Sequence, residues 1–355
     1  TAEGETLQAN YTSSEGFTTA NISGVFDTEF SGDGKTVFLG EKGVGDKGVE
    51  VIAQDSQGRI FVAGSIYMEN PATYYDAAIW CYTQNGELCS DFGTGGLVKH
   101  DGANTVQEDE GINAILIDSQ DAIYAFGRTD THAAIWKFDS SGALDASFDT
   151  DGIKSFQVAT RDRNWISQAA LDNNGNLVIV GSALNSPYSD LVGFVAKLSA
   201  TTGEFDTSFN SDGFVTFETI NEDVDMDYGY IEFSNLLLDG SYIYVKGSGN
   251  YDPYNQDVLI GKLNADGTPN TTFGGNGFVF NRTVIDDAAN ESGKALALTE
   301  SGKLIIAGVS ANQDDDDQIS IWRFDATTGE ADTSFGTDGA VFQPFLTDDP
   351  AYIEG

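Results

Sequence analysis

The residues of this chain that could do chemistry are few, apart from its carboxylates. Cys81 and Cys89 are the two cysteines, and they flank a Gly-containing turn. Two thiols are too few to hold zinc, and the spacing is not Cys-x-x-Cys, so a metal or redox centre is not indicated. A close pair across a turn can form a disulfide, although so low a cysteine count is also typical of cytosolic proteins.

Catalytic chemistry has little support in the sequence. The two histidines, His100 and His132, lie far from any Gly-x-Ser-x-Gly or comparable nucleophile motif. A glycosidase needs a pair of carboxylates, but 56 acidic residues offer too many pairs for spacing to single one out. The chain is therefore predicted to be non-catalytic, with a carboxylate-based enzyme as the alternative.

One acidic loop partly imitates a calcium-binding loop. Asp223, Asp225 and Asp227 alternate just before Gly229, and carboxylate oxygens are the ligands that calcium prefers. The Gly falls one place late and Ser234 stands where an EF-hand has its final Glu, so an EF-hand is excluded. An irregular calcium site at the three aspartates stays open, and no cofactor is required.

Charge and composition exclude several classes of protein. Lys and Arg total 17 against 56 Asp and Glu, for a formal net charge of −39, so nucleic-acid binding, which needs clustered cations, is excluded. No apolar run approaches the length of a transmembrane segment. Strong acidity, and a start at Thr1 without an initiator Met, favour an exported chain whose signal peptide has been removed. We expect a periplasmic, cell-surface or secreted protein.

One phrase recurs six times, about every 60 residues, and in its regular form reads Leu-Asp-Thr-Ser-Phe-Gly-x-x-Gly. Between the copies, β-branched and aromatic runs alternate with Gly-containing turns, which is the pattern of β-hairpins. Four strands in about 60 residues make one propeller blade, so an all-β propeller is predicted. The aromatic residue of each copy is called here the phrase phenylalanine: Phe30, Phe92, Phe148, Phe209, Phe273 and Phe335.

Each phrase is expected to link the last strand of one blade to the first strand of the next. Six links around a closed ring require six blades, so the sixth must combine residues 1–30 with 336–355, with 339–344 as its first strand. A five-bladed ring, which needs no composite blade, is the alternative. Within a single domain spanning 1–355, the other units run approximately 31–92, 93–148, 149–209, 210–273 and 274–335.

The phrase and the hairpin motif at 302–308, Gly-Lys-Leu-Ile-Ile-Ala-Gly, together resemble the delta-60 repeat family of bacterial tandem repeats. The likeness covers about residues 26–343. Cys89 in place of the phrase's Asp, and Asp121-Ala122 in place of the hairpin Gly-Lys, depart from the pattern. The resemblance implies a β-propeller and an exported setting, and it implies no reaction.

A basic residue recurs on the strand before the phrase, with an acid or Asn at the phrase's second position. In the first unit the same two positions hold Cys81 and Cys89. A covalent pair can replace an ion pair only where the two positions are neighbours, so we predict structural contacts and a disulfide. The pairs are Lys137 with Asp145, Lys197 with Asp206, Lys262 with Asn270 and Arg323 with Asp332.

A second acid recurs before the second strand of each unit. Repetition in every blade favours a structural role, in which each acid caps the backbone amides of the Gly turn that follows it. The alternative is a cation-attracting rim on one face of the ring, since carboxylates suit calcium. These acids are Asp46, Asp109, Asp162, Asp227 and Glu291.

Loop tyrosines are the candidate ligand-binding residues. Gathered on one rim they could stack against sugar rings or contact a protein, whereas scattered they would be ordinary loop packing. With no catalytic constellation in view, the chain is predicted to be an exported binding or scaffold module for a glycan or protein at the cell surface. The alternative is a carbohydrate-active enzyme with carboxylates at the channel mouth. The tyrosines are Tyr74, Tyr75, Tyr188, Tyr251 and Tyr254.

Overall fold

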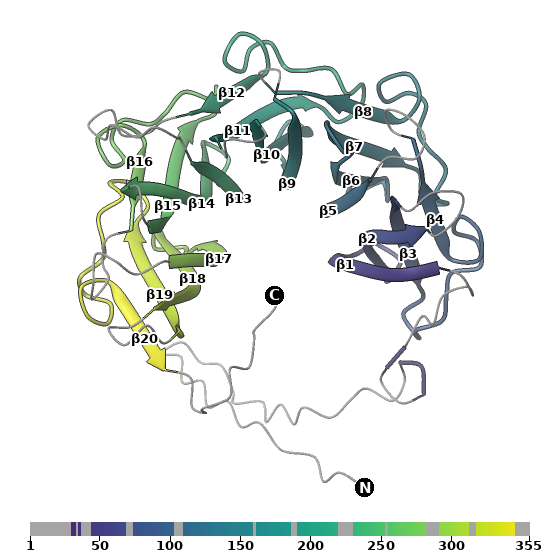
Figure 1. Cartoon of the computed structure of the whole chain (residues 1–355), viewed down its shortest axis with the longest axis horizontal. Helices are drawn as coiled ribbons and strands as arrows, with labels where there is room; N and C mark the ends of the chain where they lie inside the picture. Colours follow the sequence, from purple (N-terminus) through teal and green to yellow (C-terminus); the bar gives the residue numbers. More distant parts are fainter. Residues whose placement is uncertain are drawn as a thin grey trace, which may run out of the picture.

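The computed structural model of the chain consists of β-sheets arranged as blades around a common centre (Figure 1). In its described residues, twenty strands form five four-stranded antiparallel sheets and no helix is present, so the predicted all-β propeller is confirmed. The same residues accordingly contain no helix that could cross a membrane. The structure describes residues 30–32, 35–36, 44–68, 74–102, 109–158, 161–185, 190–218, 230–252, 255–281, 291–311 and 317–344.

Each sheet is a meander whose first strand lies closest to the centre (Figure 1). The sheets are numbered here as blades 1 to 5 in chain order. The innermost strands are β1 (Val44–Gln54), β5 (Gly111–Ile117), β9 (Arg163–Leu171), β13 (Ile231–Leu238) and β17 (Glu291–Leu298). The second strands are β2 (Ile60–Met68), β6 (Ile123–Arg128), β10 (Asn176–Asn185), β14 (Tyr242–Asp252) and β18 (Lys303–Ala311).

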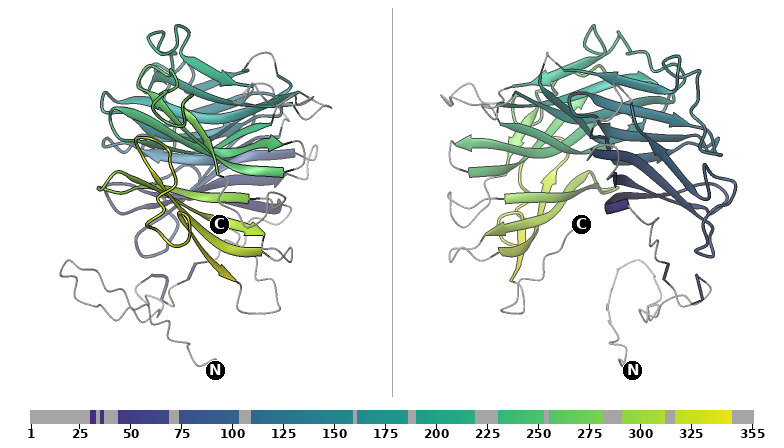
Figure 2. Two further views of the ribbon diagram at one scale, coloured as in Figure 1. Left: turned by 90° about the vertical axis from the view of Figure 1, so that its left-hand side faces the viewer. Right: turned by 45° about the vertical axis from the view of Figure 1, so that its right-hand side comes forward.

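The outer half of each blade consists of a long third strand and a short fourth strand. The third strands are β3 (Tyr74–Tyr82), β7 (Ala133–Phe138), β11 (Asp190–Ser199), β15 (Asn255–Asn264) and β19 (Asp317–Asp325). The outermost strands are β4 (Leu97–His100), β8 (Ile153–Phe156), β12 (Phe214–Phe217), β16 (Phe278–Phe280) and β20 (Ala340–Pro344). Strands of every blade run across the thickness of the ring, so their ends form two rims (Figure 2). We call the rim on which the innermost strands begin the start rim.

The short strand after each phrase closes the blade that precedes it, which corrects the predicted strand order. β20 pairs with β19, from Gln318 opposite Pro344 to Trp322 opposite Ala340, and β4 pairs with β3 in the same way. A tight connection suffices between antiparallel neighbours, so the phrase stays inside one sheet, and the step to the next blade uses the acidic loops. Residues 340–344 therefore belong to blade 5 and not to a sixth blade.

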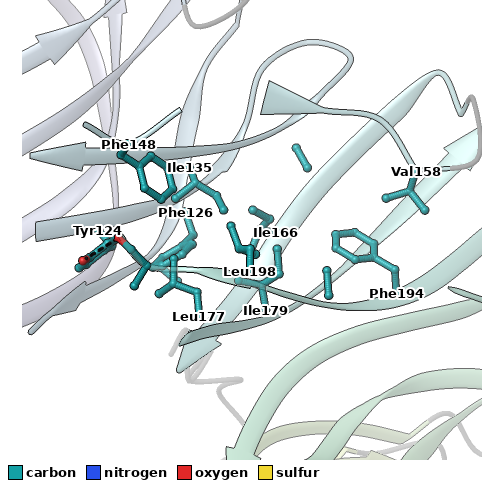
Figure 3. Packing of buried hydrophobic residues seen from close by; sticks show 14 of the residues in the cluster. Tyr124, Phe126, Ile135, Phe148, Val158, Ile166, Leu177, Ile179, Phe194 and Leu198 are labelled. Atoms are coloured by element: carbon teal, nitrogen blue, oxygen red, sulfur yellow. Dashed lines mark hydrogen bonds between the residues drawn. The ribbon is translucent and has the colours of Figure 1, made fainter. Parts of the chain in front are cut away.

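Apolar side chains from facing sheets pack together between the blades. Phe126 and Ile135 of blade 2 form one buried cluster with Ile166, Ile179 and Phe194 of blade 3 (Figure 3). Third strands such as β7 are buried at every position, because both faces of the sheet meet a neighbouring blade. Burial of these continuous apolar runs is what holds neighbouring blades together.

A repeated contact, called here the blade lock, joins a phrase to the turn after the third strand of the blade that follows it. Phe148 is fully buried beneath Gly203, and the Asp149 N–H donates to the Thr202 carbonyl at 3.0 Å. A Cβ on Gly203 would meet Phe148 Cζ at 3.2 Å, and its φ of +71° favours glycine. The lock recurs where Phe30 meets Gly86, Phe92 meets Gly142, Phe209 meets Gly267 and Phe273 meets Gly329.

The five described blades leave an opening between blade 5 and blade 1 (Figure 1). Successive innermost strands contact one another from β1 through β5, β9 and β13 to β17, and within the described ranges β17 makes no comparable contact with β1. Of the residues predicted for the sixth blade (1–30 and 336–355), 1–29 and 345–355 lie outside the described residues, whereas 340–344 belong to blade 5. The structure thus establishes five blades, while the predicted composite blade stays a prediction.

Candidate functional site

The recurring pairs before and within the phrase lie in contact through their backbones, and the charged pairs also through their side chains, while Lys262 Nζ donates to the Ala326 carbonyl. A disulfide joins Cys81 and Cys89, with Cα atoms 5.4 Å apart, as predicted. Lys137 Nζ lies 2.9 Å from Asp145 Oδ2, and the Asp145 N–H donates to the Lys137 carbonyl exactly where the Cys89 N–H donates to that of Cys81. Hydrogen bonds from Ser147, followed by the contact with Lys137, lower the pKa of Asp145 to about 2. The remaining charged pairs are Arg323 with Asp332 at 2.9 Å and Lys197 with Asp206 at 3.8 Å.

Removal of the disulfide should destabilise blade 1 more than removal of an equivalent ion pair. The loop that it closes is short, so we expect a Cys81→Ala/Cys89→Ala variant to lose about 2–3 kcal/mol of unfolding free energy. Lys137→Met/Asp145→Asn should lose about 1 kcal/mol or less, because that pair is partly exposed. Urea unfolding of both variants measures the difference, with reduced wild-type protein as control. Equal stability of the two variants would contradict this assignment.

The recurring acids do not share one structural position, which corrects the sequence alignment of the repeats. Strand register provides the reference: Ile112, Ile166 and Gly293 each pair with the Gly in the middle of the second strand. Asp109, Asp162 and Glu291 stand three, four and two residues before these reference positions, so an alignment on the residue that follows each acid does not match the strand register. Asp227 lies outside the described residues, as does the side chain of Asp46. The three comparable acids still share the start rim, since all of them stand at the beginning of an innermost strand.

Two of the described acids, Asp109 and Glu291, accept hydrogen bonds from the preceding blade. Asp109 Oδ1 accepts a hydrogen bond of 2.9 Å from the N–H of Tyr75 in the preceding blade, and the adjacent Glu110 N–H donates to the Tyr75 carbonyl. These bonds tie the beginning of β5 to the beginning of β3. The acid thus links two blades, a role that repeat spacing alone did not indicate.

Two buried glutamates anchor blade junctions in the same way. Glu110 Oε1 accepts from the Gly102 N–H, and its Oε2 lies 3.2 Å from His100 Nδ1 at the end of β4. Glu291 occupies the corresponding place in blade 5, where its Oε2 accepts from Asn281 just after β16. Burial raises the pKa of Glu291 to about 8, against the opposing effect of the Asn281 hydrogen bond. Both glutamates therefore hold the outermost strand of the preceding blade, which is a structural role.

Of the predicted ligand-binding tyrosines, the structure describes the side chains of two. Tyr74 is buried and hydrogen-bonded to Asp101, so it belongs to packing. Tyr75 is 38% exposed, and its ring centroid lies 5.2 Å from that of Tyr67, its cross-strand partner on β2. Tyr188 and Tyr254 lie outside the described residues, and so does the side chain of Tyr251. Sequence reasoning missed Tyr67, although its position in the hairpin opposite Tyr75 was available as a signal.

A buried carboxyl group lies beside Tyr75 on the same strand. Asp76 is 4% exposed, and its Oδ1 has no hydrogen-bond partner. Burial, reinforced by the charges of Asp101 and Glu110, raises the pKa of Asp76 to about 6, while Lys99 and His100 oppose the shift. The signal that could have revealed it is a lone acid within an otherwise apolar strand. We call Tyr67, Tyr75, Asp76 and Asp101 the tyrosine–aspartate rim.

The tyrosine–aspartate rim combines two recognition chemistries on one blade. Tyr67 and Tyr75 provide aromatic surface at the end of β2 and the beginning of β3. Asp101 provides an exposed carboxylate at the end of β4, whereas Asp76 Oδ1 is buried beneath the rim. Aromatic faces pack against the C–H faces of sugars, and carboxylates accept hydrogen bonds from hydroxyl groups. The disulfide at the far end of β3 fixes the strand that carries Tyr75 and Asp76.

No metal centre emerges from the part of the chain that the structure describes. Within it, no group of three or more His, Cys, Asp and Glu side chains is arranged to hold an ion. Asp223 and Asp225 lie outside the described residues, as Asp227 does. The calcium site expected there stays a prediction.

Comparison with protein families gives one match. The family described as "Domain of unknown function (DUF5122) beta-propeller" matches residues 56–92 and 300–335. Each stretch runs from the turn between the first two strands to the phrase phenylalanine, in blade 1 and in blade 5. The two stretches cover about a fifth of the chain. They support a tandem-repeat β-propeller. They do not identify the chain as a member of the delta-60 repeat family.

Comparison with solved structures gives propeller-like but distant neighbours, and comparison with curated protein sequences gives no match. A subtype N11 neuraminidase-like protein of A/flat-faced bat/Peru/033/2010 (H18N11) is 9% identical over 85% of this chain and 74% of its own, with a TM-score of 0.44. An endo-1,4-beta-xylanase of Bacteroides thetaiotaomicron is 11% identical over 84% and 93%, with a TM-score of 0.38. PorZ of Porphyromonas gingivalis is 10% identical over 79% and 40%, with a TM-score of 0.36. These values carry no argument about function, and the fold rests on the sheets themselves.

Proposed function

We propose that the protein is an exported, non-catalytic β-propeller that binds a glycan at the tyrosine–aspartate rim. The observation that carries this proposal is the exposed ring of Tyr75, paired with Tyr67 on the rim where Asp101 is also exposed. Among the described tyrosine side chains, Tyr75 is the one exposed beyond a third of its surface. A partly exposed aromatic pair on the rim that also carries the exposed Asp101 suits a ligand with both apolar faces and hydroxyl groups.

Two further features support an extracellular binding role. The Cys81–Cys89 disulfide suits an oxidising compartment, which is where such bonds persist. The formal charge of −39 keeps the molecule soluble and repels anionic ligands, which favours neutral or cationic sugars. Calcium is included as a variable in the experiment, because the acidic loop around Asp225 is a predicted calcium site.

A glycan array with and without calcium, followed by calorimetry on the best neutral oligosaccharide, tests the proposal. We expect Tyr75→Ala to weaken binding about tenfold, equivalent to about 1.4 kcal/mol, because the ring loses its stacking partner. Ile52→Ala serves as the control, since it removes an exposed apolar side chain from the same blade, near the end of β1 that faces the other rim. Equal affinity of Tyr75→Ala and wild type, or no bound glycan at all, would refute the proposal.

A carbohydrate-active enzyme is the second candidate, favoured by the raised pKa of Asp76. A carboxyl that titrates near pH 6 beside other acids can serve as a general acid in glycoside hydrolysis. Against it, Asp76 lies on the third strand of its blade and not on the innermost strand at the channel mouth. Release of reducing sugar by wild type, abolished in Asp76→Asn, would favour the enzyme. Binding without release would favour the binding module.

A further inference from the structure

Blade 1 has an exposed apolar surface toward the opening in the ring. Val49 and Ile52 of β1 are 60% and 67% exposed. Val49 pairs with Gly64, and the residues in the same register in blades 2, 3 and 4 are Ile112, Ile166 and Phe233. Those three are at most 2% exposed, because each packs against the preceding blade. Val49 therefore marks a face that lacks a described neighbour.

Blade 5 has the complementary surface on the other side of the opening. Ile319 and Ile321 of β19 point away from blade 4 and are half-buried, whereas Trp322, on the opposite face, is buried against blade 4. Val341, which pairs with Ile321, is 40% exposed. Phe335 is half-buried, while the phrase phenylalanines of blades 1 to 4 are at most 1% exposed. The opening is thus bordered by two apolar sheet faces.

The blade lock indicates what this surface accepts. In each described lock, the residue after the phrase phenylalanine donates its N–H to the carbonyl just before the turn Gly of the next blade. Ser31 donates in this way to Asn85 at 2.7 Å, so the phrase containing Phe30 occupies the position directly before blade 1. Gly336 has a φ of +58°, close to the +60° of Gly274 in a complete lock. Within the described ranges, no turn stands opposite Phe335 and Gly336.

The sequence contains one further Gly at the spacing of a turn that could pair with Phe335. The turn Gly stands six residues before the phrase phenylalanine in every blade, as in Gly86 before Phe92 and Gly329 before Phe335. Gly24 stands six residues before Phe30, in the segment Asn21-Ile22-Ser23-Gly24. The five turns of blades 1 to 5 are already occupied by phrases of the same chain. Among the glycines at this spacing, Gly24 is the one with no described contact to a phrase phenylalanine. Among the phrase phenylalanines, Phe335 is the one with no described contact to a turn Gly.

We propose that residues 21–24 dock on blade 5 and close the ring. Gly24 would lie over the ring of Phe335, and the Ser23 carbonyl would accept the Gly336 N–H. The same chain is the favoured occupant, because Phe30 holds the N-terminal segment at the opening and six residues span about 20 Å when extended. This short tether gives the turn a high effective concentration, which the turn of a second copy lacks.

Hydrogen exchange at Gly336, followed by mass spectrometry in the full-length protein, tests the latch. We expect the Gly336 amide to be protected like that of Gly274, which has a donor role in a complete lock. A Cβ at the turn Gly would crowd the phenylalanine ring, as at Gly142, where it would meet Phe92 Cε2 at 2.9 Å. Gly24→Ala should therefore speed exchange at Gly336 at least tenfold. Gly16→Ala, an N-terminal glycine outside the repeat spacing, should leave it unchanged.

Three results would overturn the proposal. Free exchange of the Gly336 amide in the wild type would show that nothing accepts it. Protection that is insensitive to Gly24→Ala would assign the contact to another segment. Protection that grows with protein concentration, together with a dimeric mass, would assign the surface to a second copy. The glycan experiment does not depend on any of these outcomes, because Tyr75 lies on the start rim.

Discussion

Gly127→Ala is expected to destabilise the protein by about 3 kcal/mol or more. Gly127 lies in the middle of β6, where a Cβ would stand 1.8 Å from the carbonyl oxygen of Gly111 on β5. The clash is with backbone, so it can be relieved only by separating the two strands and breaking their hydrogen bonds. The same close approach recurs in every blade, at 2.0 Å for Gly64, 2.0 Å for Gly181, 1.7 Å for Gly247 and 2.1 Å for Gly308.

Gly111→Ala is the matched control, since Gly111 lies on the facing strand of the same pair. A Cβ there would meet nothing within 4 Å, and its φ lies in the ordinary range for L-residues. Alanine should restrict the unfolded chain at no steric expense, and stability should change little or rise by about 0.4–1 kcal/mol. Urea unfolding followed by tryptophan fluorescence measures both variants. A Gly127→Ala protein as stable as Gly111→Ala would mean that the β5–β6 register is not the one described.

Phe148→Ala is expected to lower the unfolding free energy by about 3–5 kcal/mol. The ring is fully buried between blades 2 and 3, packs edge-on to Tyr124 at 6.4 Å between centroids, and lies 5.9 Å from Lys137 Nζ. Truncation would leave a cavity beneath Gly203 and would remove the cation–π contact with the lysine. The loss should therefore exceed that from an ordinary surface aromatic.

Phe148→Leu tests how much of the destabilisation comes from the cavity and how much from the loss of the aromatic ring. Leucine retains much of the apolar area, so the destabilisation should be clearly smaller than that of the alanine variant. Denaturant midpoints at equal m-values give the comparison. If Phe148→Ala lowered the unfolding free energy by less than about 1 kcal/mol, the phrase phenylalanine would contribute little to holding neighbouring blades together.

The fold was predictable because its determinants are local in sequence. The phrase, the hairpin turns and the short β-branched runs specify four strands in each repeat. The disulfide was predictable for the same reason, since Cys81 and Cys89 take two positions that form contacting pairs in other blades. When two positions of a repeat change together from an ion pair to a cysteine pair, the exchange indicates that the two positions are neighbours, and the repeats of one chain are enough to show it.

The strand order and the rim were harder to predict because they depend on register. The strand after a phrase could pair with the preceding sheet or with the following one. Repeat spacing is the same in both cases, so it does not distinguish them. Glu110 and Glu291 are equivalent, because each stands two residues before the residue that pairs with the mid-strand Gly of the second strand, although the Gly that follows each acid made Asp109 appear to match Glu291. Asp76 was missed because a third strand covered on both faces has no polar alternation to mark its orientation.

The blade lock also bears on how the molecule folds and unfolds. Each lock joins only consecutive blades, through residues less than one repeat apart in sequence, as Phe148 and Gly203 are. The assembly is then a nearest-neighbour system, in which every interior unit has two couplings and every terminal unit has one. Cooperativity in such an array depends on its weakest junction, and unfolding proceeds inward from the unit that has lost a partner. A latch across the opening would convert this linear array into a circular one and give all units equal coupling.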